Sequence, residues 1–339
     1  MQKVLVIQTA FIGDVVLSTA LLESIHKKDV SNKIDVLVRK GNESLLHGHP
    51  FVNEVIVWDK KKNKYRNWLK ILFQLRQKKY DVVLNVQRFA ATGLWTAFSN
   101  AKFKIGFDKN PFSFLFTHVV HHEQQKPGVH EIDKNHKLLE VVWDCPSSKP
   151  KLYPTQADLN RVSEYQSKPY ICIAPASVWY TKQFPIHKWI QFVNEVSFEG
   201  NIYIIGGPGD IAMGESILQG VTTNAGQQKQ VISLVGQLSY LASAALQKNA
   251  VLNFVNDSAP MHFASAMNAP VVAIYCSTVP AFGFGPLSEQ SFLVQSNQAL
   301  PCRPCGVHGK KACPLGHFNC AETIEMQQLF APLSQMAQH

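Results

Sequence analysis

The sequence predicts an α/β protein made of two Rossmann-like domains, each with a parallel sheet, that face one another across a cleft. Short apolar runs alternate with amphipathic stretches along the chain, as in β–α–β units. The alternation stops at a proline-rich segment, residues 146–154, and then starts again. Each half also opens with an apolar run that leads into a turn suited to a ligand. We therefore expect one domain at residues 1–150, a second at 151–320, and a closing segment at 321–339.

In the first half, strand-length runs rich in valine and isoleucine indicate buried parallel strands. The expected strands are residues 3–9, 33–38, 54–58 and 81–86. Apolar residues at helical spacing predict helices at 15–27, 65–79 and 131–143. Residues 106–122 contain Pro111 and several phenylalanines, and we expect an irregular loop there.

The second half repeats the alternation of strand and helix patterns. The expected strands are residues 170–174, 201–205, 231–235, 251–255 and 271–275. Helices are expected at 186–196 and 260–267, with further helices between the strands. A last helix, at about 322–337, closes the chain.

Composition narrows the class of protein. The 339 residues are 46% hydrophobic and 17% charged, as in an ordinary soluble protein. No apolar run reaches the roughly 18 residues that a membrane span needs. Polar Gln8 and the pair Gly13-Asp14 interrupt the N-terminal run before a signal-peptide core can form. We therefore expect a cytoplasmic protein.

The formal net charge of +9 suggests an anionic partner. Much of this charge lies in one aromatic-rich stretch, at Lys60, Lys61, Lys62, Lys64, Arg66, Lys70, Arg76, Lys78 and Lys79. The stretch is either a solvated helix face or a contact with anionic lipid headgroups or an acidic glycolipid. Peripheral contact with a membrane surface is thus one expectation. No zinc-finger, RNP or helix-turn-helix pattern supports binding to nucleic acid.

The turn between the expected strand 251–255 and the expected helix 260–267 carries the strongest site signal. It contains Asp257, Ser258, Ala259 and Pro260, with His262 just inside the helix. The free N–H groups at a helix start favour an anion, and ligands bind at the carboxyl ends of parallel strands. As alternatives, Asp257 or Ser258 only caps the helix and His262 is a core residue.

A second turn, Gly13-Asp14, follows the first strand. Gly13 permits a sharp turn there. Asp14 then lies at the start of the next helix, either as a helix cap or as a group facing the cleft.

Other motifs are less specific. The glycines of residues 206–209 suggest a nicotinamide enzyme, but they do not form Gly-x-Gly-x-x-Gly after a first strand.

The C-terminal Cys302, Cys305, Cys313 and Cys320 are weak candidates for zinc or an iron–sulfur cluster, or only part of a structured loop. Five histidines gather between residues 118 and 136 without a convincing ligand spacing, so no metal site is assigned there.

Four segments resemble glycosyltransferase family 9, which contains the ADP-heptose:lipopolysaccharide heptosyltransferases. Residues 257–266 match its Asp-Ser/Thr-Gly-x-x-His-x-Ala-Ala pattern, with Ala259 in place of glycine and Ser265 in place of one alanine, and residues 282–287 match the later Gly-Pro loop. Residues 12–19 resemble the opening motif. Residues 174–189 resemble a segment with a hydroxyl residue, a lysine and Trp-Pro, in which Phe184 replaces the tryptophan.

The resemblance implies a GT-B fold and a role for each matching residue. Asp14 would be the general base that deprotonates the acceptor hydroxyl. Ser177 would bind a phosphate, and Lys182 would neutralise the diphosphate. By its position after the glycines of residues 206–209, Asp210 is expected to touch the donor ribose. The remaining implied donor-binding residues are Asp257, Ser258, Ala259, Pro260, Met261 and His262. The loop at 106–122 would lie on the acceptor side.

The implied reaction is the single displacement of ADP from ADP-heptose by a lipid A–core acceptor, with inversion and with no required cofactor. Three alternatives remain open. They are a glycosyltransferase of the same family with another nucleotide sugar, a non-catalytic protein that binds nucleotide sugars or glycolipids, and an NAD-dependent dehydrogenase.

Overall fold

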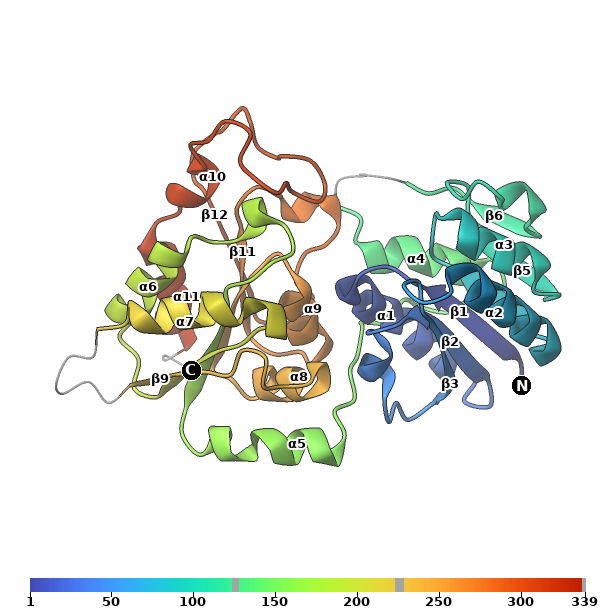
Figure 1. Cartoon of the computed structure of the whole chain (residues 1–339), viewed down its shortest axis with the longest axis horizontal. Coiled ribbons are helices and arrows are strands. Elements are labelled where there is room, and N and C mark those ends of the chain that lie inside the picture. Colours follow the sequence, from blue (N-terminus) through green and yellow to red (C-terminus); the bar gives the residue numbers. More distant parts are fainter. Residues whose placement is uncertain (124–127, 223–228, 337–339) are drawn as a thin grey trace. The chain divides into compact units, whose positions relative to one another are not determined.

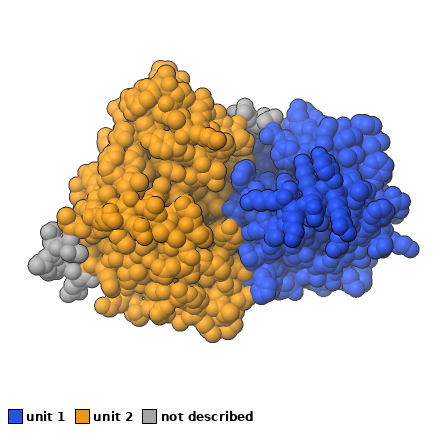
Figure 2. Space-filling view, in the orientation of Figure 1, with its two compact units in different colours: residues 1–153 blue, residues 154–339 orange. Residues whose placement is uncertain are grey.

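The computed structural model describes residues 1–123, 128–222 and 229–336. The chain divides into two compact units, Met1–Tyr153 and Pro154–His339 (Figures 1 and 2). The sequence puts this boundary between residues 150 and 151. Each unit is an α/β domain built on one parallel sheet with helices packed against it (Figure 1). In the described part of the chain, no helix is both long enough and apolar enough to cross a membrane.

Unit 1 contains a six-stranded parallel sheet in the order β3-β2-β1-β4-β5-β6. Its strands are β1 (Lys3–Gln8), β2 (Lys33–Arg39), β3 (Val52–Trp58), β4 (Val82–Asn85), β5 (Phe103–Phe107) and β6 (His118–Val120). Its α-helices are α1 (Ile12–Lys28), α2 (Lys64–Lys78), α3 (Ala90–Phe98) and α4 (Glu131–Glu140).

Unit 2 repeats this architecture with the sheet order β12-β11-β10-β7-β8-β9, again all parallel. Its strands are β7 (Tyr170–Ala174), β8 (Asn201–Ile204), β9 (Gln230–Ser233), β10 (Leu252–Asn256), β11 (Val271–Tyr275) and β12 (Ser291–Gln295). Its α-helices are α5 (Gln156–Val162), α6 (Ile186–Glu195), α7 (Ile211–Gln219), α8 (Tyr240–Lys248), α9 (Ala259–Ala266), α10 (Asn319–Glu322) and α11 (Met326–Met336).

The sheet of unit 2 is buried on both faces, which explains its continuous apolar runs. Side chains alternate along β7, so Ile171 and Ile173 join one core cluster with Trp189 and Phe192 of α6. Tyr170, Cys172 and Ala174 face the opposite way and pack in a second cluster with residues of α8 and α9. Two apolar faces exclude water from the sheet and leave the strand ends as the place for polar chemistry.

Both sheets have the strand order of a doubly wound fold, in which ligands bind where the order reverses. That point lies between β1 and β4 in unit 1 and between β7 and β10 in unit 2. Asp14 follows β1, Lys182 follows β7 and Asp257 follows β10. Two doubly wound α/β domains with parallel sheets are present, as the sequence predicts, whereas the cleft between the domains stays a prediction.

Three expectations about local structure are wrong, namely the loop at 106–122, the turn at Gly13 and the uninterrupted closing helix. Residues 106–122 are not one loop, because β5 ends within them and β6 adds an edge strand. A Cβ built on Gly106 would lie 2.6 Å from the Phe116 ring, so the absence of a side chain lets the two segments pack together. Gly13 does not form the turn after β1, because α1 already begins at Ile12 and the chain bends at Ala10.

The closing helix is interrupted. It consists of α10 and α11, and residues 323–325 between them are not helical. Ile324 is buried in the core there, and the Glu325 N–H donates to the Gln328 side chain where α11 starts. The end of the predicted helix at residue 337 lies outside the described residues.

Candidate functional site

The loop after β7 presents Lys182 in a short 3-10 turn, Tyr180–Lys182. This loop is fixed to the end of β10 through Asn256, the last residue of that strand. The Asn256 amide donates to the Pro175 carbonyl at 2.6 Å and accepts from the Phe184 N–H at 3.1 Å. The two strand ends that flank the switch point of unit 2 are thereby held together.

Lys182 and Asp257 form a direct ion pair at this switch point. The ammonium nitrogen of Lys182 lies 2.7 Å from the Oδ2 atom of Asp257, and both side chains are largely buried. The Thr278 hydroxyl donates to the same Oδ2 atom at 2.6 Å. The carboxylate is therefore held from two sides, and it fixes the position of the lysine. An ammonium group has three donors, so this contact leaves donors for a second anion.

A hydroxyl pair links the lysine turn to two other loops. The Thr181 side-chain oxygen accepts from Ser277 Oγ at 2.9 Å and from the Lys310 N–H at 2.8 Å. The Cys305 N–H donates to the Ser277 carbonyl at 2.9 Å. The turn that carries Lys182 thus rests on the loop after β11 and on the cysteine-rich C-terminal loop.

The start of α9 follows Asp257 directly. Ser258 is the N-cap, with extended backbone and no side-chain cap hydrogen bond. Pro260 has no N–H to offer, and the Met261 N–H already donates to the Ser258 carbonyl at 3.1 Å. The N–H of Ala259 therefore becomes the most direct donor that this helix start can offer to an anion.

Two side chains near the start of α9 are buried. Met261 is fully buried, and its sulfur accepts from the Tyr275 hydroxyl. His262 is also buried, on the same short helix. The role of these two side chains in donor binding stays a prediction.

Two other predicted donor residues lie in separate turns. Ser177 is half-buried in the loop after β7, and its carbonyl accepts from the Gln183 side chain at 2.7 Å. Asp210 follows β8, and its Oδ2 accepts from the Gly207 N–H at 2.9 Å. The glycine-rich turn at residues 206–209 therefore follows β8, which is one strand away from the switch point.

Asp14 lies in the first turn of α1, half-buried, and helix α4 packs against α1. Glu131, at the start of α4, lies 3.7 Å from the ammonium of Lys134, and Lys134 is buried. Burial raises the pKa of Glu131 to about 7, Lys134 opposes this shift, and the charge of Asp14 adds to it. Asp14 thus shares its surroundings with a second carboxylate that titrates near neutral pH.

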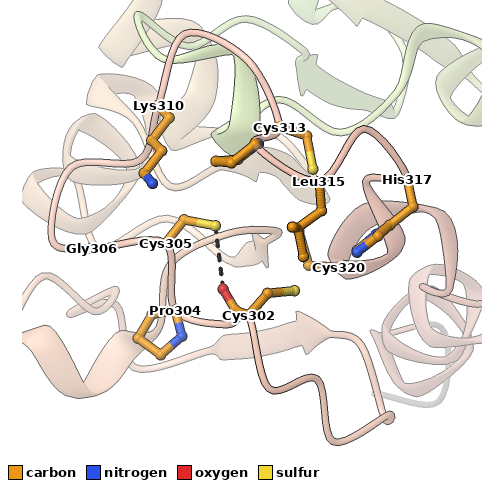
Figure 3. A pocket seen from close by; sticks show the side chains of 10 residues that line it. Cys302, Pro304, Cys305, Gly306, Lys310, Cys313, Leu315, His317 and Cys320 are labelled. Atoms are coloured by element: carbon orange, nitrogen blue, oxygen red, sulfur yellow. Dashed lines mark hydrogen bonds between the residues drawn. The ribbon is translucent and has the colours of Figure 1, made fainter.

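The four C-terminal cysteines line one pocket of about 450 Å³, together with Lys310 and His317 (Figure 3). Figure 3 shows the Cys305 thiol directed at the Cys302 carbonyl, to which it donates at 3.4 Å. Burial opposes ionisation of Cys313, but the backbone N–H groups of residues 315–318 outweigh it and lower the pKa of this thiol. Burial raises the pKa of Cys320 to about 11.

Cysteine and histidine side chains are common metal ligands. Among residues 1–123, 128–222 and 229–336, no group of three or more His, Cys, Asp or Glu side chains is arranged to hold a metal ion. The histidines of the middle segment instead make separate contacts. His121 lies 2.7 Å from Asp108, and His136 lies 2.7 Å from the Cys145 carbonyl.

The structure therefore brings together only some of the residues that the sequence singles out. Lys182, Asp257 and the start of α9 form one site in unit 2, while Asp14 lies in unit 1. Sequence reasoning missed Thr278 and Glu131. Thr278 follows the end of an expected strand, and this position is the only feature of the sequence that indicates it. Nothing in the local sequence indicates a role for Glu131.

The comparisons with known proteins agree with one another. The family model described as Glycosyltransferase family 9 (heptosyltransferase) matches residues 68–315. Lipopolysaccharide heptosyltransferase 3 of Escherichia coli is 25% identical over 290 residues, which cover 79% of this chain and 82% of that protein.

Two solved structures share the fold. The ADP-heptose lipopolysaccharide heptosyltransferase II of Escherichia coli has a TM-score of 0.80 at 21% identity, and the match covers 99% of this chain and 98% of that one. The glycosyl transferase family 9 protein of Veillonella parvula has a TM-score of 0.85 at 20% identity, with coverage of 99% and 97%.

Proposed function

The chain belongs to glycosyltransferase family 9, the heptosyltransferase family, and from this premise we propose that it transfers a heptose from ADP-heptose to a lipid A–core acceptor of lipopolysaccharide. The observation that carries the proposal is the pairing of Lys182 with Asp257 at the switch point of unit 2. This is where a doubly wound domain binds its ligand. A fixed ammonium beside a helix start suits a diphosphate.

We assign the diphosphate to Lys182, Ser177 and the Ala259 N–H at the start of α9. When the bond between sugar and phosphate breaks, negative charge grows on the ADP that leaves. A cation that is already in position stabilises that charge without reorganisation. Asp257 supplies the position, because it holds the Lys182 ammonium at 2.7 Å.

We assign the general base to Asp14. In a single displacement, the acceptor oxygen bonds to the anomeric carbon as the bond from that carbon to the ADP oxygen breaks. The acceptor proton passes to the Asp14 carboxylate, and the configuration at the anomeric carbon inverts. The donor already contains its leaving group, so the reaction requires no cofactor.

We further propose that the enzyme works in the cytoplasm, on the cytoplasmic face of the inner membrane. The proposed donor is a water-soluble nucleotide sugar, whereas the proposed acceptor is an anionic lipid. A protein that joins the two has to meet a membrane surface.

Calorimetric titration tests the donor assignment. We expect ADP to bind and to compete with ADP-heptose, while NAD does not compete. Lys182→Ala should weaken ADP binding about tenfold or more, because it removes a charge-assisted contact. ADP-glucose in the same titration tests the choice of sugar. Tight binding of NAD in competition with ADP would instead favour the dehydrogenase alternative.

A further inference from the structure

We propose that the outward face of α2 binds the surface of an anionic lipid bilayer through an apolar stripe flanked by cations. Helix α2 has two apolar faces. Ile71 and Leu75 point inward and are buried against the sheet of unit 1. The other face carries Tyr65, Leu69 and Phe73, which remain exposed. A helix that only covered a sheet would need the first face alone.

The exposed residues form one continuous stripe. Tyr65, Leu69 and Phe73 are four residues apart, so they lie one above the other on a single side of the helix. They are 79%, 48% and 62% exposed, respectively. Single exposed apolar residues are common, but three large ones in register on one face mark a surface that binds something apolar.

Cations surround this stripe. Arg66, Lys70 and Arg76 lie on the same exposed side of α2. Lys61, Lys62 and Lys64 are exposed just before it or in its first turn. Residues 60–80 contain no aspartate or glutamate. The whole segment therefore presents one sign of charge around an apolar centre.

Two of the nine cations in this stretch are used by the fold itself. Lys60 donates to the Thr9 carbonyl at 3.3 Å and lies over the Trp58 ring. Lys78 pairs with buried Asp35 at 3.0 Å and with Glu54. Both anchor α2 and its preceding loop to unit 1. The membrane contact therefore depends on the exposed cations and not on these two.

The charge pattern decides between possible occupants. A second copy of this chain, packed face to face through the stripe, would bring cations against cations, which is unfavourable without intervening anions. A soluble polyanion would satisfy the cations but leave the apolar stripe in water. An anionic bilayer satisfies both, because its headgroups attract Lys and Arg while its interface accepts aromatic and aliphatic side chains. This inference deepens the proposed function. It rests on that function only for the identity of the lipid acceptor that the enzyme would meet at the membrane.

The test is co-sedimentation of the full chain with vesicles of phosphatidylcholine and phosphatidylglycerol, and with vesicles of phosphatidylcholine only. We expect binding to the anionic vesicles and a steep loss of it at high salt. A variant with Tyr65→Ser, Leu69→Ser and Phe73→Ser should bind at least about tenfold more weakly, since it loses three apolar side chains that the bilayer interface would bury. A variant with Lys61→Gln, Lys62→Gln, Arg66→Gln and Lys70→Gln should show a loss of about the same size, since it removes four cations from the contact.

The matched control replaces similarly exposed apolar residues elsewhere. Val30, Leu159 and Leu293 are 74%, 41% and 52% exposed, respectively, and their change to serine should leave vesicle binding unchanged. Circular dichroism and thermal melting verify that each variant folds. If the stripe variant binds like the control, or if the wild type binds RNA but not vesicles, the inference is wrong. ADP binding, measured on the same samples, is independent of this outcome and separates its failure from failure of the proposed function.

Discussion

The Asp257 carboxylate holds the Lys182 ammonium at 2.7 Å and takes a second hydrogen bond from Thr278 at 2.6 Å. An acidic side chain next to a proposed diphosphate site would repel the ligand if it acted alone. Its contact with Lys182 gives it another role, which is to position the cation. We therefore propose that Asp257 is a positioning residue and that Lys182 is the group that meets the donor.

A double-mutant cycle tests this relationship. Lys182→Ala should lower turnover and weaken donor binding, and Asp257→Ala should lower turnover by a smaller factor, about tenfold. If Asp257 acts through Lys182, the double variant should be no worse than Lys182→Ala, because the carboxylate has nothing left to position. Steady-state kcat and KM of the four proteins provide the measurement. Fully additive losses would show that Asp257 acts independently.

The C-terminal loop should influence the donor site through a glycine contact. Gly309 has a φ of +75°, and a Cβ placed on it would lie 3.1 Å from Cγ of Lys182 and 3.0 Å from the Thr181 hydroxyl. Gly306, in the same loop, has a φ of +86°, and a Cβ placed on it would meet nothing within 4 Å. Alanine at either position strains the backbone by about 1 kcal/mol.

Only Gly309→Ala should also displace Lys182. We expect Gly309→Ala to weaken ADP binding several-fold, while Gly306→Ala leaves ADP binding unchanged. Both variants should lower the melting temperature by a similar amount. Calorimetry and thermal melting on the pair provide the comparison. Equal ADP affinities in the two variants would disconnect the loop from the site.

Glu131 should give turnover a dependence on pH near neutrality. Its pKa is raised to about 7, chiefly by burial. As the pH rises through 7 the carboxyl ionises, and the added negative charge makes neighbouring Asp14 a stronger base. Turnover of the wild type should therefore rise with an inflection near pH 7, and Glu131→Gln should lack it. An identical pH profile in both proteins would remove Glu131 from the vicinity of the chemistry.

The same group affects stability in the opposite direction. The folded pKa of about 7 exceeds the ordinary glutamate pKa of 4.5, so the folded state keeps a proton that the unfolded state has lost between these values. The contribution of Glu131 to the free energy of unfolding is therefore fully present below pH 4.5 and is lost as the pH rises through 7. Glu131→Gln should be more stable than the wild type at pH 8, by on the order of 2 kcal/mol, with little difference at pH 4.5. Urea unfolding at the two pH values measures this.

Asp14→Asn should separate chemistry from binding. The amide keeps the size of the side chain but is not a base, so turnover should fall by about two to four orders of magnitude. ADP affinity should hardly change, because Asp14 lies in unit 1 and the proposed donor site in unit 2. Near-normal turnover would reduce Asp14 to a residue of the first helical turn.

Much of the fold follows from local sequence signals. Buried parallel strands are continuous apolar runs, so β1, β7, β10 and β11 can be found from the sequence. Short edge strands such as β6 lack that signal, because much of their surface is exposed. The break between α10 and α11 is set by burial of Ile324 in the core, which no local pattern contains.

For the candidate site, the sequence indicates individual residues but not the contacts between them. Lys182 and Asp257 lie after strands and within motifs, so the sequence indicates each of them separately. Their contact joins two loops, and the Lys310 N–H that supports Thr181 is 129 residues away along the chain. Glu131 becomes notable only because α4 packs on α1. Contacts of this kind depend on the folded chain and cannot be deduced from spacing.

The most direct measurement of the central claim is transfer itself. Purified protein is incubated with ADP-heptose and a lipid A–core acceptor that lacks heptose, and the products are followed by mass spectrometry and NMR. We predict release of one ADP for each heptose added to the lipid, with inverted anomeric configuration, and transfer by Asp14→Asn that is slower by about two to four orders of magnitude. Release of ADP without heptose on the lipid, or a product with retained configuration, would contradict the account.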